Sequence, residues 1–102
     1  MTEQSLVIFF QYASDELGPI FALEDDVAAA IEDAGAGEYD GHELALLDEH
    51  DAFLFMYGPN ADALYQAVRP VIEASPLLRG GEATLRYGAA DDERAAERRI
   101  SL

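Results

Sequence analysis

Two short stretches of this sequence are apolar on both of their faces, and they limit the folds open to the chain. Residues 5–12 read Ser-Leu-Val-Ile-Phe-Phe-Gln-Tyr, and residues 52–57 read Ala-Phe-Leu-Phe-Met-Tyr. β-Branched and aromatic residues favour strands, and a strand that is apolar on both faces needs cover on both. We therefore expect two central strands of one sheet.

Two stretches with helical spacing follow these strands. Apolar residues recur at the spacing of a helix over residues 19–34, before a glycine that predicts a left-handed stop. A second pattern begins after Asn60, which is a good N-cap. Pro70 lies inside this second pattern and predicts a kink or an early stop, with the Ser75-Pro76 pair as the latest end.

Two more strands and a tail complete the predicted fold. Residues 37–45 form a hairpin with residues 52–57, and residues 82–87 alternate as a half-buried edge strand should. Residues 89–102 predict a short C-terminal helix or a tail. The order β-α-β-β-α-β predicts an α+β, ferredoxin-like sandwich with both helices on one face of an antiparallel sheet of order 4-1-3-2. A different four-stranded α+β arrangement is the main alternative.

Length, charge and composition exclude several classes of function. The 102 residues suffice for one core, so we expect a single domain over residues 1–102 with its core at about residues 5–88. Twenty-one acidic residues against six basic ones give a formal charge of -15, which would repel nucleic acid. Cysteine is absent, so disulfides and thiolate sites are excluded. We expect no cofactor.

The apolar runs and the start of the sequence predict a cytoplasmic protein without membrane contact. The longest apolar run is far shorter than a membrane span, and the acidic start lacks the basic region of a signal peptide. Residues 1–68 hold 15 acids and no base, while residues 69–102 hold six acids and all six arginines. As the explanation of the acidic excess, we favour a solvated surface over a dedicated cation or partner site.

Three short segments resemble a group of small bacterial proteins to which no function is assigned. The segments are Gly37–Glu43 (GEYDGHE), Tyr57–Asp62 (YGPNAD) and Leu85–Gly88 (LRYG). The resemblance spans about residues 20–88 and implies no activity, so no role of a residue follows from it.

Parity along the strands predicts which side chains face away from the helices. The expected open-face residues are Val7, Phe9 and Gln11, then Glu38, Asp40 and His42, then Phe53, Phe55 and Tyr57, and finally Glu82, Thr84 and Arg86. The third strand leaves two choices. We favour its aromatic residues on the open face, because the alternative set of Ala52, Leu54 and Met56 is smaller and fits under helices more easily.

This open face predicts an interface. Its apolar floor consists of Val7, Phe9, Phe53 and Phe55. The floor lies between an arginine edge at Arg86 and an acidic edge at Asp40 and His42. A C-terminal helix folded over the floor is one alternative, and a two-fold face-to-face homodimer fits better. The leading function is thus a dimeric, non-catalytic binding or regulatory module whose acidic surface meets a basic protein partner or a small ligand.

Asp40 and His42 carry the alternative function, a small cofactor-independent enzyme with a pocket over the sheet face. They lie two apart on one strand, so the carboxylate would orient the imidazole as a general base, while Tyr39 or Arg86 polarises the substrate. An aspartate beside a histidine is also a common surface pair, and we rank the binding module first.

The tip of the hairpin offers weak candidates for a cation site. Asp48, His50 and Asp51 supply oxygen and imidazole donors, and Asp15 and Glu16 are expected at the same end of the sheet. This run lacks the spacing of a calcium loop, and polar hairpin tips are ordinary. We interpret the run as a solvated turn and expect no metal.

Overall fold

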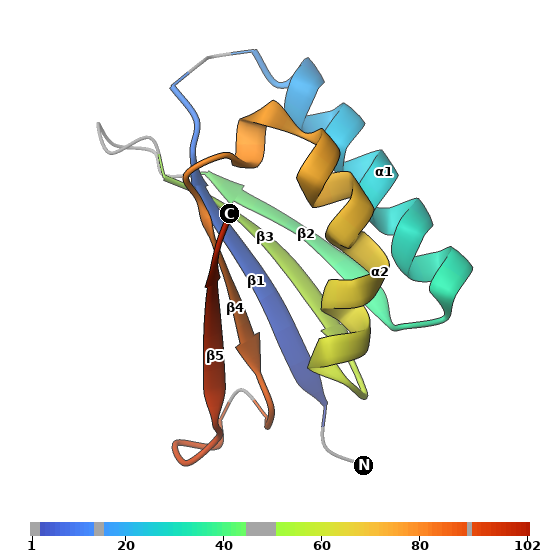
Figure 1. Ribbon diagram of the computed structural model, residues 1–102, viewed down its shortest axis with the longest axis vertical. Helices are drawn as coiled ribbons and strands as arrows, with labels where there is room; N and C mark the ends of the chain where they lie inside the picture. Colours follow the sequence, from blue (N-terminus) through green and yellow to red (C-terminus); the bar gives the residue numbers. More distant parts are fainter. Residues whose placement is uncertain (1–2, 14–15, 45–50, 90) are drawn as a thin grey trace.

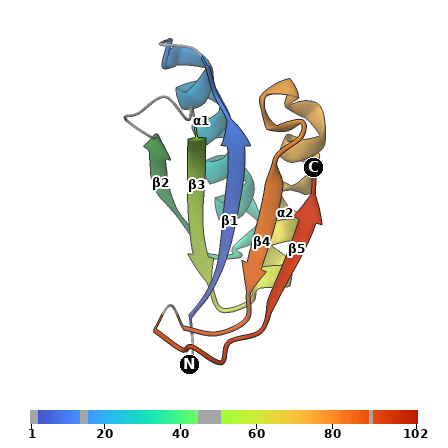
Figure 2. The same cartoon turned by 90° about the vertical axis from the view of Figure 1, so that its left-hand side faces the viewer.

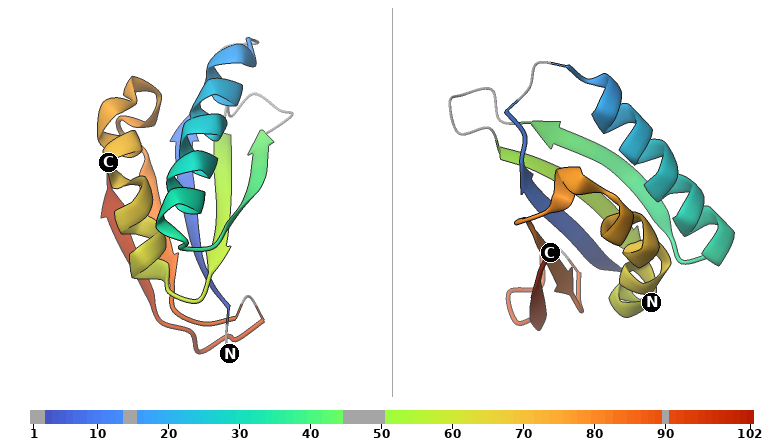
Figure 3. Two further views of the ribbon diagram at one scale, coloured as in Figure 1. Left: turned by 90° about the vertical axis from the view of Figure 1, so that its right-hand side faces the viewer. Right: turned by 45° about the horizontal axis from the view of Figure 1, so that its top comes forward.

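The computed structural model describes residues 3–13, 16–44, 51–89 and 91–102. The strands are β1 (Gln4–Gln11), β2 (Glu38–Leu44), β3 (Asp51–Gly58), β4 (Glu82–Arg86) and β5 (Glu97–Ser101), and the helices are α1 (Gly18–Ala34), α2 (Ala61–Ala74) and the short 3-10 helix η1 (Pro76–Leu78). One antiparallel sheet holds these strands in the order β2-β3-β1-β4-β5. Both α-helices cover one of its faces (Figures 1 and 3), and no described element covers the other (Figure 2).

The predicted four-stranded, ferredoxin-like sandwich with a C-terminal helix is wrong. The fold is α+β, but its sheet has five antiparallel strands among the described residues, because Glu97–Ser101 is a strand. β4 therefore lies between β1 and β5 and not at an edge. The tail contains helix-forming residues but no apolar stripe, and a short helix without buried contacts is marginal in water. Pairing with β4 satisfies backbone groups that an open sheet edge would leave to solvent.

Side chains and backbone together hold β5 against β4. Arg86 and Glu97 face each other in the register, with 2.9 Å between Nη1 and Oε2. Arg86 also donates to the carbonyls of Ala89 and Asp92 in the connecting loop. Arg86 thus fixes the turn that returns the chain to the sheet, a structural task that its exposed position in the sequence pattern did not reveal.

Both helices bury the stripes that their spacing predicts. The buried residues are Ile20, Leu23, Val27 and Ile31 in α1 and Ala61, Leu64, Val68 and Ile72 in α2. Gly35 ends α1 with a φ of 61°, a left-handed conformation that glycine adopts without strain. The Asn60 side chain caps α2 by accepting from the amide of Ala63. α2 continues past Pro70 to Ala74, so the early stop does not occur and the helix ends at the latest expected point.

The core lies between the sheet and the two helices. The strands supply Leu6, Ile8 and Phe10 from β1, Ala52, Leu54 and Met56 from β3, and Ala83 and Leu85 from β4. Because alternate residues of a strand point to opposite faces, the neighbours of these core residues point to the open face. Burial of the core side chains therefore decides the orientation of the three central strands.

Candidate functional site

The five strands lie side by side on the open face (Figure 2), and their side chains there form rows across the strands. The strand registers align three rows: Glu38, Tyr57, Ser5, Arg86 and Glu97; Gly41, Phe55, Val7, Thr84 and Arg99; and Glu43, Phe53, Phe9, Glu82 and Ser101. The middle of each row lies on β3 and β1, and the ends lie on β2 and on β4 and β5. Apolar side chains occupy the middle of two rows, whereas charged side chains are concentrated at the ends.

The structure brings together the four residues predicted to form the apolar floor. The rings of Phe9 and Phe53 stack with their centroids 5.3 Å apart, and the rings of Phe53 and Phe55 stack at 6.2 Å. Val7 pairs with Phe55 across the two strands. All four side chains are half-buried in the single chain, although no described element lies over them. The floor is thus a preformed aromatic surface.

The two edges of the open face differ in their charge. Glu38 and Glu43 are exposed on β2. On the opposite side, Arg86 is paired with Glu97, and Arg99 Nε lies 3.9 Å from an oxygen of Glu82. The β4–β5 edge therefore carries two compensated pairs, while the β2 edge carries acids alone. The acidic edge that the sequence placed at Asp40 and His42 includes Glu38 and Glu43, and His42 does not belong to it.

The predicted placement of Asp40 and His42 together on the open face is wrong. A register shift lies between Tyr39 and Gly41, so Asp40 is an extra residue without a partner on β3. This β-bulge reverses the parity that follows it, and His42 pairs with Leu54 on the helix side of the sheet. The enzyme pocket over the sheet face consequently loses its proposed base.

His42 instead belongs to a polar cluster between α1 and β2. Its Nδ1 lies 2.7 Å from Oε1 of Glu24, and the Tyr39 hydroxyl donates to Oε2 of Glu24, also at 2.7 Å. Phe21, one turn before Glu24 on α1, contacts the imidazole edge-on with ring centroids 6.1 Å apart. Burial and the hydrogen bond to Glu24 raise the pKa of Tyr39 above its ordinary value.

The raised pKa of Tyr39 predicts a loss of stability at alkaline pH. A tyrosine whose folded pKa is raised stabilises the fold fully below its unfolded pKa, near 10, and loses this contribution as the pH rises further. Melting temperatures should therefore fall more between pH 9 and pH 11 for the wild type than for Tyr39→Phe. Equal decreases in the melting temperatures of the wild type and Tyr39→Phe would contradict the proposed environment of Tyr39. The comparison of the two proteins at pH 7 serves as the control.

The remaining predicted site residues have plain structural partners or lie outside the described part. Gln11 donates to the carboxylate of Asp51 at 2.5 Å, and the Tyr12 hydroxyl donates to the carbonyl of Glu16. The other cation candidates lie outside the described residues: Asp15, Asp48 and His50. In the described ranges, no group of three or more histidine and acidic side chains is arranged to hold a metal ion.

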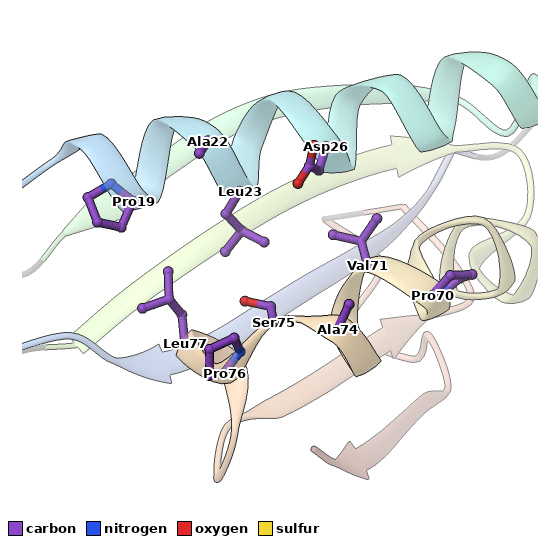
Figure 4. Close-up of a pocket in the computed structure, with 10 residues that line it drawn as sticks. All are labelled: Pro19, Ala22, Leu23, Asp26, Pro70, Val71, Ala74, Ser75, Pro76 and Leu77. Carbon is purple, nitrogen blue, oxygen red and sulfur yellow. The ribbon is translucent and has the colours of Figure 1, made fainter.

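A shallow groove lies on the opposite side of the molecule, between α1 and the end of α2 (Figure 4). Its volume is about 460 Å³, and its walls include Leu23, Val71 and Leu77. Asp26 is the one charged side chain among the described residues that line it. A ligand site combines an apolar wall with several converging polar groups, and this groove lacks the second feature.

Neither the protein-family models nor the curated proteins contain a match to this sequence. In the part of the chain that the structure describes, no helix has the length and apolar character required to cross a membrane.

Proposed function

We propose that this protein is a binding or regulatory module that forms a homodimer through the open face of its sheet. The observation that carries the proposal is the apolar floor, which consists of Val7, Phe9, Phe53 and Phe55 and lies over β3 and β1. β5 extends the sheet at its edge and does not fold over this floor (Figure 2). An apolar patch rimmed by polar groups is typical of an interaction surface.

The rows of the open face favour one dimer axis. A two-fold axis that runs along the strands, between β3 and β1, places β3 of one chain over β1 of its partner and β2 over β4. Phe53 then meets Phe9 of the partner subunit, and Phe55 meets Val7 of the partner subunit, because each pair shares a row. This arrangement buries both floors against each other.

Charge supports the same axis. Glu38 and Arg86 share a row, so the axis along the strands brings Glu38 close to Arg86 of the partner subunit. Arg86 already donates to Glu97 and to the carbonyls of Ala89 and Asp92. A guanidinium has five donors, so two remain for a second carboxylate. A two-fold axis across the strands would instead stack the acidic β2 edges on each other. Like charges in such contact oppose association.

The surface outside the interface determines the kind of partner. Each chain carries a formal charge of -15, and two chains together create a strong negative field. The proposed further partner is therefore a basic protein or a small ligand, and nucleic acid is disfavoured. A cytoplasmic location is part of the proposal, because the lack of cysteine suits a reducing compartment.

Light scattering after size-exclusion chromatography tests the dimer. At micromolar concentration, the expected mass is twice the 11.1 kDa of one chain. A mass of one chain under these conditions would contradict the proposal. The measurement requires no variant, so it is free of folding artefacts.

Reversal of the charge at Glu38 tests the axis. In the arrangement along the strands, Glu38→Arg places two cations together and should raise the Kd of the dimer by about tenfold. With the axis across the strands, the introduced guanidinium would meet Glu43 of the partner subunit, and the Kd would fall. Glu32→Arg is the matched control, because Glu32 is exposed on α1 and lies away from the open face.

A further inference from the structure

The polar cluster between α1 and β2 consists of Tyr39, Glu24 and His42 and lies away from the open face of the sheet. Both oxygens of the Glu24 carboxylate are engaged, Oε2 by the Tyr39 hydroxyl and Oε1 by His42 Nδ1. The Glu24 side chain is 16% exposed and the His42 side chain is 26% exposed. The carboxylate is thus largely removed from water, while part of the imidazole remains accessible.

A β-bulge creates this arrangement. Tyr39 and His42 are three apart, and in a regular strand they would point to opposite faces of the sheet. The extra residue Asp40 turns both of them to the helix side, where they pair with Met56 and Leu54. Gly41 has a φ of 106°, a conformation that other residues rarely adopt. Bulges re-aim side chains and are frequent beside active sites.

The hydrogen bonds decide which imidazole nitrogen can react. An ionised carboxylate only accepts hydrogen bonds, so the neutral form of His42 carries its proton on Nδ1 and its lone pair on Nε2. The raised pKa of Tyr39 keeps its hydroxyl protonated, and this hydroxyl holds Glu24 from the other side. Phe21, which is 50% exposed, supplies an aromatic surface beside the imidazole.

We propose that His42 is a nucleophilic imidazole, oriented by Glu24 and Tyr39, that cleaves activated aryl esters. Its Nε2 attacks the ester carbonyl, the bond to the aryl oxygen breaks, and the phenolate leaves with the electron pair. The resulting acyl-imidazolium keeps its Nδ1 proton against the Glu24 carboxylate. Water then attacks the acyl carbon, the bond to Nε2 breaks, and the carboxylic acid and the neutral imidazole are released after one proton passes to solvent.

This inference goes beyond the dimer and is independent of it. His42 lies on the helix side of β2, whereas the floor of Phe9, Phe53 and Phe55 lies on the opposite face. In this scheme His42 is the catalytic residue, and Glu24 and Tyr39 are positioning residues. A change in oligomeric state leaves the cluster intact, so each proposal fails or succeeds by itself.

Hydrolysis of p-nitrophenyl acetate by the full chain tests the reaction. The wild type should release p-nitrophenolate at least about a hundredfold faster than His42→Gln, within the range of a positioned imidazole. His50→Gln removes the only other histidine and should leave the rate unchanged. Asp40→Asn should also leave it unchanged, because Glu24 and not Asp40 is the partner of His42 Nδ1. Equal rates for the wild type and His42→Gln would overturn the proposal.

Nitrogen-15 NMR of the wild-type histidines provides a second test that needs no variant to fold. The neutral His42 ring should carry its proton on Nδ1, and observation of the Nε2-protonated form would overturn the proposal. Glu24→Gln removes the negative charge beside His42 but keeps an acceptor that can orient the ring, because the amide oxygen can still accept from Nδ1. We expect Glu24→Gln to keep the tautomer and to lower the rate about tenfold, whereas an unchanged rate would remove Glu24 from the scheme.

Discussion

Phe55→Glu is expected to convert the dimer into monomers at all micromolar concentrations at which light scattering can measure the mass. Phe55 lies in the middle of the floor, and the two-fold axis would bring two glutamates into one apolar interface. Burial of an unpaired carboxylate is strongly unfavourable, and loss of a central aromatic anchor costs about 4 kcal/mol. This energy corresponds to a nearly thousandfold increase in Kd.

Phe21→Glu is the matched control for this experiment. Phe21 is 50% exposed on α1, on the helix side of the molecule, so the same chemical change there should leave the mass at two chains. Phe55 points to the open face of the single chain, and its replacement should keep the far-UV circular dichroism spectrum and most of the melting temperature. A two-chain mass for Phe55→Glu would place the interface elsewhere.

Gly37→Ala should be among the most destabilising single substitutions in the chain. A Cβ atom at Gly37 would lie 2.1 Å from the carbonyl oxygen of Tyr57 and 2.8 Å from Cα of Gly58, both of them backbone atoms of β3. The φ of 149° adds strain for any residue with a side chain. We expect urea unfolding to show a loss of at least about 3 kcal/mol, since the strands must separate to relieve the overlap.

Gly18→Ala is the control for Gly37→Ala. Gly18 begins α1, and a Cβ there would meet nothing within 4 Å. The substitution reduces the freedom of the unfolded chain and should be neutral or stabilising by up to about 1 kcal/mol. An equal loss of stability in both variants would show that the close approach between residues 37 and 57 is not the reason why position 37 requires glycine.

The strands and helices that bury a full stripe could be predicted from the sequence, and the tail could not. Apolar residues on both faces marked β1 and β3, and the spacing around Leu23 and Val68 marked the helices, because the pattern and the burial agree there. In the tail, the local preference of alanine, glutamate and arginine for helix opposes pairing with β4. Pairing prevails through contacts such as Arg86 with Glu97, which join the tail to another strand and do not show in the local pattern of the tail.

The candidate site was predictable where strands are regular and not where one bulges. Parity placed Phe9 and Phe55 on the open face, but it failed at His42, because alternation cannot show an inserted residue. Gly41 was the available signal, since an isolated glycine inside a strand often marks a bulge. Glu24 was missed although it lies within the apolar stripe of α1, four residues after Ile20, where an acid needs a buried partner.

The central position of β1 has a consequence for the newly made chain. Leu6 of β1 pairs with Met56 on one side and with Leu85 on the other, so the first strand of this sheet to be synthesised must wait for two partners that appear much later. Such distant pairings form slowly, and an unpaired apolar strand is prone to aggregate. A ribosome that stalls between β3 and β4 would therefore hold a chain whose central strand has one open edge. The earliest translated strand of the sheet is therefore fully enclosed only after β4 has been made.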